Sequence, residues 1–446
     1  MKKYIFTSGL FLICLSSFAQ QKWTLRECVD HAIENNIELR QQALNVKSAE
    51  VDLSTSKNSR LPNLNASAGQ DFNFGRSIRT STNTVGSGNV GSTSIGLSSS
   101  IPLFTGFRIP NQIKQDEFDL LAATEGLKKA QENLELQVVS LFLDVLFKKE
   151  ILKAYQDQLT LSNQQVEKTQ ILVESGKVPA SQLFDMKAQA ARDELNVTMS
   201  KNDLDLSLLN LSQSLNLQQQ GSFDVVEPDI ANALDNSITS IIPVDQVYQV
   251  ALGTKPQIKE AEYKIESSKK GLKIAQADYY PSLDMNMRYS TGFDHVYKSG
   301  YDNPSISSQL GSNQTKYIGF SLSIPIFNRF RVRNQVRTAR LNIENQTLAM
   351  DNIKLALYKE IQQAYQSATS AQAKYNSTEK ALDAAEESFK YARERYDIGK
   401  STVFEYNEAQ TKLLTSQSDQ IQAKYDFIFR SKILDFYQGG KPIDIQ

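Results

Sequence analysis

Four short stretches of the chain alternate between apolar residues and small or polar residues with a period of two. They lie near 62–74, 94–104, 281–291 and 316–327. In the third stretch, Leu283, Met285 and Met287 alternate with Asp284 and Asn286. Such alternation predicts strands with one apolar face and one polar face. A half-buried soluble sheet would show the same pattern, but runs of about 9 to 11 residues match the span of a tilted strand in a bilayer.

Each pair of predicted strands is joined by a long polar segment. Residues 75–93 are rich in Gly, Ser, Thr and Asn, and residues 292–315 form a second polar stretch, as in the exposed loops of outer-membrane barrels. Four strands in lipid would leave unpaired N–H and C=O groups at their edges, each costing several kcal/mol, and the smallest membrane barrels have about eight strands. Closing the sheet therefore requires more than one copy of the chain. The strand count alone leaves two, three or four copies open.

Long helices are predicted after each strand pair. Apolar or small residues recur in alternating steps of four and three from Leu134 to Val173, and again from Leu357 to Tyr396. Proline is absent from 111–175, so this stretch predicts a single helix of roughly 65 residues, on the order of 100 Å long. The many small and polar residues in both seams suit helices packed side by side over a curved surface. They suit the alternative, a plain coiled-coil rod, less well.

Each long helix is expected to end at a glycine that caps its C-terminus, Gly176 in the first half and Gly399 in the second. New amphipathic stretches follow over 183–217 and 404–436, so each half is predicted to form an antiparallel helical hairpin. Shorter helices are expected ahead of the strands, over 24–58 and 244–277.

The two halves of the chain repeat one another. Ile95 opens the sequence Ile-Gly-Leu-Ser-Ser-Ser-Ile-Pro-Leu-Phe, and Ile318, 223 residues later, opens Ile-Gly-Phe-Ser-Leu-Ser-Ile-Pro-Ile-Phe. The two helical seams are also 223 residues apart, whereas the spacing upstream, between Pro62 and Pro281, is 219. The predicted organisation is a signal peptide (1–19), a first repeat (20–217, with the hairpin over 110–217), a linker (218–242), a second repeat (243–437, with the hairpin over 329–437) and a C-terminal tail (438–446).

The N-terminus has the features of an export signal. Residues 1–19 begin with a short basic start, continue with an apolar run, and carry Ser17 and Ala19 at the positions that signal peptidase reads. Cys14 lies inside this segment after a bulky residue, which argues against a lipoprotein site. Only Cys28 remains after cleavage, so no intramolecular disulfide is expected. No later apolar run reaches about 18 residues, so strands must cross any membrane that the chain spans.

The sequence offers no chemistry of an enzyme or of a nucleic-acid-binding protein. A formal net charge of −1 provides no basic field for nucleic acid. Residues 399–402 resemble the end of a phosphate-binding loop, but Glu394 stands where the first glycine is required. His31 and His295 lie in different elements, without the spacing of zinc ligands. We therefore expect no catalytic, cofactor or metal site.

The order of helix, strand, loop, strand and helical hairpin, repeated twice behind a signal peptide, resembles the TolC family of outer-membrane efflux proteins. The motifs that carry the resemblance are the turns Arg60-Leu61-Pro62-Asn63-Leu64 and Tyr279-Tyr280-Pro281-Ser282-Leu283, the strand exits Ile101-Pro102-Leu103-Phe104-Thr105-Gly106 and Ile324-Pro325-Ile326-Phe327, and the tip glycines with the dipeptides Ala188-Gln189 and Ala409-Gln410. The resemblance covers almost the whole mature chain. It implies a homotrimer in which four strands from each copy close a 12-stranded transmembrane β-barrel, continued across the periplasm by an α-helical barrel.

The same resemblance implies a passive exit duct in the outer membrane of a Gram-negative bacterium. Such a duct serves a tripartite efflux or type I secretion system, in which a periplasmic adaptor and an inner-membrane transporter dock at the hairpin tips. The tip residues in this sequence are Gly176, Lys177, Gly399 and Lys400. Substrate choice would lie with the transporter. The alternative, from a different class, is a periplasmic coiled-coil adaptor or scaffold that forms no pore.

The resemblance also implies a constriction at the tip of the second hairpin. Family members place two carboxylates one helical turn apart there, and Glu405 and Glu408 match these positions, with glutamate in place of the usual aspartate. In a trimer they would form two acidic rings that favour cations, whereas the alternative is a solvated helix face. Tyr396 matches a tyrosine that helps to hold the tip closed, although Ser401 replaces its usual arginine partner. Asp185 lies near the first tip, where we expect a loop two residues longer than at the second.

Overall fold

The computed structural model describes residues 22–79, 84–87, 89–217, 223–228, 242–298 and 300–439. The predicted signal peptide, most of the predicted linker and nearly all of the predicted C-terminal tail lie outside these ranges. The chain divides into two compact units, the hairpin unit of residues 1–41, 128–255 and 354–446 and the sheet unit of residues 42–127 and 256–353.

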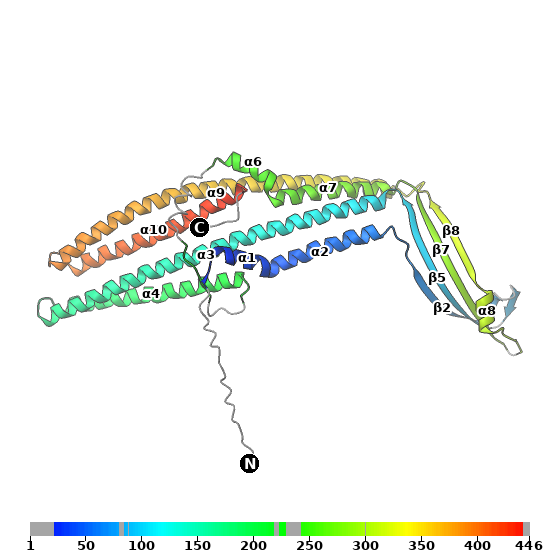
Figure 1. The fold of residues 1–446 in the computed structure, drawn as a ribbon, viewed down its shortest axis with the longest axis horizontal. Coiled ribbons are helices and arrows are strands. Elements are labelled where there is room, and N and C mark those ends of the chain that lie inside the picture. Colours follow the sequence, from blue (N-terminus) through cyan, green and yellow to red (C-terminus); the bar gives the residue numbers. More distant parts are fainter. Residues whose placement is uncertain are drawn as a thin grey trace, which may run out of the picture. The chain divides into compact units, whose positions relative to one another are not determined.

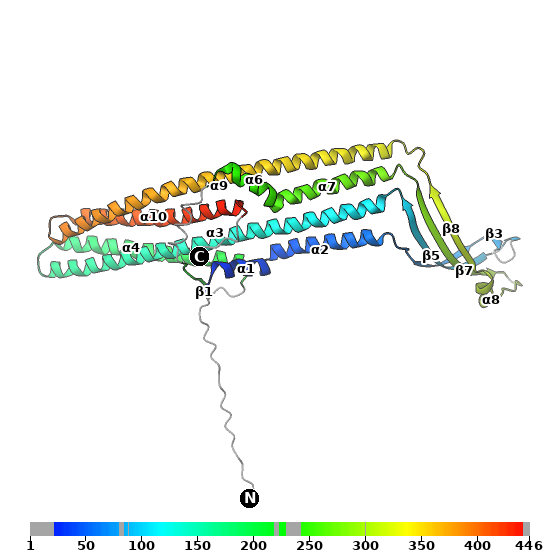
Figure 2. The same cartoon turned by 45° about the horizontal axis from the view of Figure 1, so that its top comes forward.

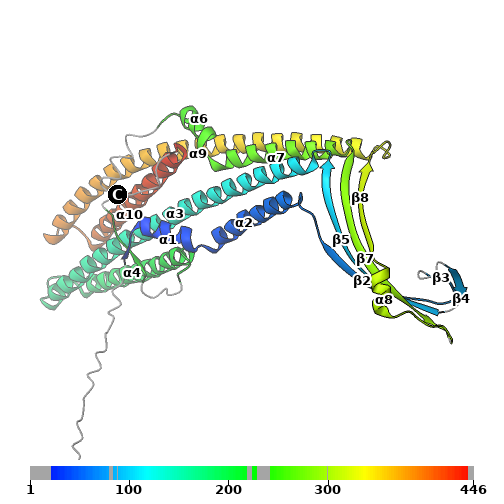
Figure 3. The ribbon, with the colours of Figure 1, turned by 45° about the vertical axis from the view of Figure 1, so that its right-hand side comes forward.

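The sheet unit contains a four-stranded antiparallel sheet with the order β2-β5-β7-β8. Its strands are β2 (Asn65–Asn73), β5 (Asn89–Thr105), β7 (Ser282–Tyr297) and β8 (Thr315–Ser323). Figure 1 and Figure 3 show these strands side by side in a curved sheet. The connections between strands contain a short hairpin, β3 (Arg76–Arg79) and β4 (Thr84–Ser87), and the helix α8 (Ile306–Ser312).

The strand register separates apolar from polar side chains. Met285 of β7 lies opposite Ile101 of β5 and Phe320 of β8, and Met287 lies opposite Ile318. Residues directly opposite one another point to the same face of a sheet. The other face carries small and polar residues, among them Asn65, Ser98, Ser100, Asn286, Arg288, Gly319 and Ser321. The alternation in the sequence therefore predicts the two faces of the sheet correctly.

Two strands are longer than the sequence pattern predicts. β5 begins at Asn89 and β7 extends to Tyr297, and these two residues lie opposite one another. The expected loops over 75–93 and 292–315 are therefore wrong at the strand ends. The extra residues were assigned to loops because they are polar, but polar side chains do not interrupt the backbone hydrogen bonds of a strand pair.

Proline limits the strands at their other ends. β8 ends at Ser323, short of the predicted end near 327. Pro325 follows and has no N–H to donate to the ladder. β5 contains Pro102, and the register shifts between Pro102 and Phe104, so this strand accommodates its proline with a bulge.

Each of the two predicted helices ahead of the strands is broken in two. The first pair is α1 (Leu25–Asn35) and α2 (Ile37–Asn58), and the second is α6 (Val244–Thr254) and α7 (Pro256–Ala277). Asn36 has extended backbone, and its side chain accepts a hydrogen bond from the N–H of Leu39, which starts a new helix. Lys255 is extended because the residue before a proline disfavours the helical conformation, and Pro256 suits the first position of a helix.

The two long hairpins have matching lengths. The first consists of α3 (Arg108–Glu174) and α4 (Ala180–Ser214), and the second of α9 (Arg331–Asp397) and α10 (Val403–Tyr437). Figure 2 shows α4 beside α3 and α10 beside α9. The long helix has 67 residues and the shorter one 35 in both hairpins. Among the described helices, none combines the length and the apolar character needed to cross a membrane.

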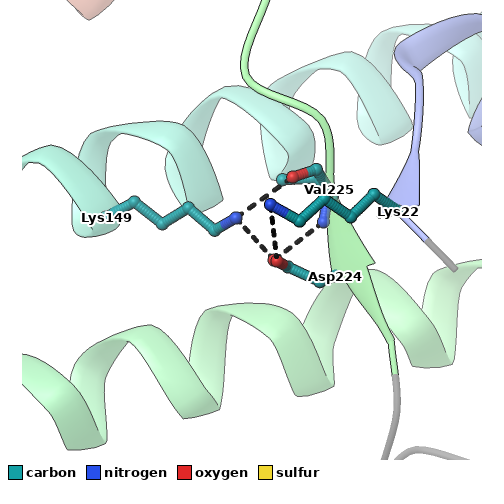
Figure 4. A network of polar contacts seen from close by, with 4 residues as sticks. All are labelled: Lys22, Lys149, Asp224 and Val225. Atoms are coloured by element: carbon teal, nitrogen blue, oxygen red, sulfur yellow. Dashed lines mark hydrogen bonds and ion pairs between the residues drawn. The ribbon is translucent and has the colours of Figure 1, made fainter. Parts of the chain in front are cut away.

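A polar cluster attaches the start of the described chain to α3. β1 (Lys22–Trp23) pairs in parallel with β6 (Asp224–Val225). The Nζ atom of Lys149 on α3 lies 2.5 Å from Oδ1 of Asp224 and donates a hydrogen bond to the carbonyl oxygen of Val225 at 3.1 Å (Figure 4). Lys22 lies 3.9 Å from the other oxygen of the same carboxylate. The cluster connects two segments that are about 200 residues apart in sequence through one lysine of the first hairpin.

Candidate functional site

The hairpin tips carry the glycines that the sequence predicts. Gly399 has a φ of 73°, its N–H donates to the carbonyl of Tyr396, and the N–H of Lys400 donates to the carbonyl of Arg395 at 2.8 Å. This pair of bonds is the Schellman cap, and the left-handed φ that it requires favours glycine. Gly176, with a φ of 71°, forms the same cap at the first tip.

The turns at the two tips have equal lengths, so the prediction of a longer first loop is wrong. Because α4 and α10 begin 223 residues apart, as α3 and α9 do, the repeat spacing continues through the turn. Asp185 and Glu408 therefore stand at equivalent positions, in the second turn of their helices, and Gln182 is the counterpart of Glu405. Both Asp185 and Glu408 are exposed.

Glu405 has a structural task at the start of α10. Its carboxylate accepts a hydrogen bond from the N–H of Thr402 at 3.0 Å and from the hydroxyl of Ser401 at 2.6 Å, while the Thr402 hydroxyl accepts from the N–H of Glu405. This is a capping box, and its signal in the sequence is threonine followed three residues later by glutamate. The hydrogen bond from Ser401, followed by that from Thr402, lowers the pKa of the Glu405 carboxyl. The cap therefore stabilises the fold above the unfolded-state pKa of this group and is lost as pH falls through the lowered folded-state value.

Tyr396 packs into an apolar cluster that joins the two hairpins. Its ring lies 4.9 Å from that of Tyr406, which is fully buried. The core of the cluster consists of Met186 from α4, Phe389 from α9, and Val403 and Tyr406 from α10. Burial raises the pKa of Tyr406 to about 12, so the phenol is neutral at physiological pH. The hairpins are therefore held together just behind their tips by aromatic packing.

A buried polar network lies next to this cluster. The Asp193 carboxyl on α4 is 2% exposed and accepts hydrogen bonds from Oγ of Ser162 at 2.5 Å, Nε2 of Gln189 at 3.0 Å and Nε2 of Gln158 at 3.4 Å. Nε2 of Gln410 on α10 donates to Oγ of Ser162 at 3.3 Å. The network therefore connects α3, α4 and α10. Sequence reasoning missed it, although the polar Ser162 in an otherwise largely apolar seam is its signal.

The network belongs to the first hairpin only. At the equivalent positions of the second hairpin, 223 residues later, Gln158 and Ser162 are replaced by Ala381 and Ala385, and Asp193 by Ser416. The two hairpins thus share backbone geometry but differ in how their helices are joined.

Comparison with known proteins identifies the family. A family model described as "Outer membrane efflux protein" matches residues 28–217 and 247–439, one match in each repeat and most of the chain. The chain belongs to the outer membrane efflux protein family. The prediction of this family from the sequence is confirmed.

Relatives of the family match along most of their length. The chain is 22% identical to the outer membrane efflux protein BepC of Brucella suis, over 92% of this chain and 84% of that protein. It is 22% identical to the outer membrane protein TolC of Escherichia coli, over 94% of this chain and 83% of that protein. The Campylobacter jejuni CmeC outer membrane channel has a similar fold, with a TM-score of 0.75 and 19% identity over 93% of this chain and 85% of that one.

Family membership settles the class of function. Like other outer membrane efflux proteins, this protein is an outer-membrane channel that serves as the exit duct of an efflux or secretion system, with its long helices on the periplasmic side. The alternative of a pore-free periplasmic adaptor is not favoured.

Proposed function

We propose that three copies of the chain close a 12-stranded barrel in the outer membrane and continue it as a helical tunnel through the periplasm. The observation that carries this proposal is the open sheet. In the described part of the chain, β2 and β8 each have a strand neighbour on one side only. The apolar residues of β8 are exposed, with Ile318 at 67%, Phe320 at 66% and Leu322 at 62%. In lipid, such an apolar face is stable only if the edges of the sheet are paired.

The internal repeat predicts the register between copies. β8 is the counterpart of β5, and β2 is the counterpart of β7, so the β5–β7 pair within the chain is the template for β8 and the β2 strand of the next copy. Ser99 lies opposite Met287 within the chain. Spacings of 223 for β5 and 219 for β7 place Leu322 opposite Ala68 of the neighbouring copy.

A disulfide between copies tests this register. Ala68→Cys combined with Leu322→Cys is expected to form covalent trimers on oxidation in membranes, because directly opposite residues have Cβ atoms close enough for a disulfide. Non-reducing gel electrophoresis measures the product. Ala68→Cys combined with Ile318→Cys, four residues out of register, is the matched control and should stay monomeric on the gel. Equal cross-linking of both pairs, or none of the first, contradicts the closed trimer.

The hairpin tips are the proposed docking positions for partners. Gly176 and Lys177 at one tip, and Gly399 and Lys400 at the other, lie at equivalent positions and have the same capped geometry. The two tips of each copy can therefore offer similar surfaces to a periplasmic adaptor, behind which the inner-membrane transporter supplies the substrate. The proposed partners follow from the family, and the equal tips support a quasi-sixfold ring of docking sites.

The proposed constriction consists of Glu408 and Asp185, with Glu405 beside them and Tyr396 behind. Because Glu408 and Asp185 are equivalent positions in equal hairpins, a trimer would bring six carboxyl groups to one level. A ring of acidic side chains favours cations and repels anions. Glu405 lies one turn nearer the tip, and its carboxylate is occupied by the capping box.

Ion selectivity separates these carboxyl groups. We expect the double variant Glu408→Gln and Asp185→Asn to lower the ratio of cation to anion permeability several-fold. Glu405→Gln, which keeps a side chain able to cap the helix, should lower it less. Reversal potentials in planar bilayers under a salt gradient measure both effects. The placement of the constriction is wrong if Glu405→Gln has the larger effect or if the double variant keeps the wild-type reversal potential.

A further inference from the structure

Five arginines are clustered where β8 leads into α9. They are Arg329, Arg331, Arg333, Arg337 and Arg340, and all five are exposed. Residues 329–340 contain no aspartate or glutamate, so this arginine segment has a net charge of +5 in a chain whose formal net charge is −1. The side chains of residues 333, 337 and 340 are spaced by four and three residues, which places them along one stripe of the helix.

The corresponding segment of the first repeat, residues 106–117, is neutral. Its two basic residues are both paired, Arg108 with Asp278 and Lys114 with Glu117. In the arginine segment, Arg340 occupies the position of Glu117. The positive charge is thus specific to the second repeat and is not required by the helix-to-strand junction itself.

The stability of α9 does not explain this charge. Arg331 and Arg333 lie in the first turn of the helix, where the positive end of the helix dipole disfavours cations. The first turn of α9 contains no acidic residue. An anionic partner is therefore needed to offset both the dipole and the mutual repulsion of the arginines.

Exposed apolar side chains lie directly beside the arginine segment. Ile324, Ile326, Phe327 and Phe330 are all more than half exposed. The rings of Phe327 and Phe330 pack edge to face at 5.6 Å, and the guanidinium of Arg333 lies 5.6 Å from the centre of the Phe330 ring. Aromatic rings with basic residues at one end of an apolar strand face are characteristic of the boundary between lipid chains and head groups.

We propose that the arginine segment binds the phosphate groups of anionic phospholipids in the periplasmic leaflet of the outer membrane. The inference rests on the proposed function, because the closed barrel sets the depth of β8 in the bilayer. A neighbouring copy is the less favoured source of negative charge. Asp278, which pairs with Arg108 inside the chain, has Ser59 as its counterpart in α2, so the seam between copies lacks the equivalent carboxylate.

Lipid retention tests the proposal on the full-length protein. The triple variant Arg333→Gln, Arg337→Gln and Arg340→Gln is compared with the wild type in detergent after addition of phosphatidylglycerol or phosphatidylcholine. Native mass spectrometry counts the lipids that remain bound. We expect the wild type to retain phosphatidylglycerol preferentially, and the triple variant to lose this preference, because head-group phosphates pair with clustered basic side chains.

Two further variants make the result specific. Replacing Lys359, Lys374 and Lys380 of the same helix with Gln removes the same charge and should leave the preference intact, as should replacing the three arginines with Lys. Retention of phosphatidylglycerol by the arginine-to-glutamine variant at the wild-type level overturns the proposal. So does dissociation of its trimer without a change in lipid retention, since the arginines then serve a neighbouring copy. A wild type that binds lipid selectively as a monomer contradicts the trimeric duct but not the lipid site.

Discussion

Replacing Gly106 with alanine is expected to destabilise the sheet unit strongly. Gly106 has a φ of 61°, and a Cβ atom at this position would overlap the carbonyl oxygen of Ala277 and lie 2.9 Å from Cβ of Tyr280. Ala277 is the last residue of α7, so the clash pushes the helix away from the strand exit. Left-handed backbone strain and overpacking together should lower the free energy of unfolding by about 2–5 kcal/mol.

The second repeat supplies a matched control for this substitution. Arg329 occupies the position of Gly106 and has a φ of 55°, although it carries a side chain. Arg329→Gly relieves left-handed strain while it adds backbone entropy to the unfolded chain, so its effect should be within about 1 kcal/mol of zero. The midpoint of thermal unfolding in detergent measures both variants. Equal midpoints for Gly106→Ala and the wild type would show that close packing at Ala277 is not a constraint.

Asp193→Ala is expected to have the second large effect, in the hairpin unit. The substitution leaves the hydroxyl of Ser162 and the amides of Gln158 and Gln189 without their shared acceptor in a buried position. Lost hydrogen bonds and unsatisfied donors should cost about 2–4 kcal/mol of unfolding free energy. Because Gln410 joins the same network, the contact between the two hairpins should loosen as well.

Denaturant unfolding and limited proteolysis together measure these effects. Asp193→Asn keeps one acceptor oxygen and should fall between the wild type and Asp193→Ala. Ser416→Ala, at the equivalent position of the second hairpin, should change stability by less than about 0.5 kcal/mol, because no network surrounds it. Faster cleavage near the tips in Asp193→Ala, but not in Ser416→Ala, is the expected pattern. Equal losses in both variants would assign the effect to helix packing in general.

Much of the fold could be predicted because its main signals are local. The period of two in β7 fixes which side of the sheet Met285 and Met287 occupy, whatever strand lies next to them. The glycines at 176 and 399 predict the hairpin tips because a left-handed cap favours that residue. The repeat spacing extends these signals from one half of the chain to the other.

The features that sequence reasoning missed depend on distant or competing contacts. The partners of Asp193 lie on three helices, and no periodicity records which polar residues meet there. Matching the dipeptides Ala188-Gln189 and Ala409-Gln410 gave a false difference in loop length, because small residues and glutamine recur by chance in helices. The Thr402 to Glu405 motif did encode the helix cap, but the family resemblance drew attention only to its charge.

The arginine at position 329 has a mechanical consequence for a ring of three copies. Inside each chain, glycine allows the end of α7 to approach the strand exit closely. At the junction between copies the corresponding neighbour is Asn58, at the end of α2, and the Arg329 side chain occupies the space that glycine leaves open. Three stiff joints would then alternate with three more compliant ones around the ring. Mild denaturation should part the ring at the compliant joints, releasing intact chains before any single chain loses its own sheet.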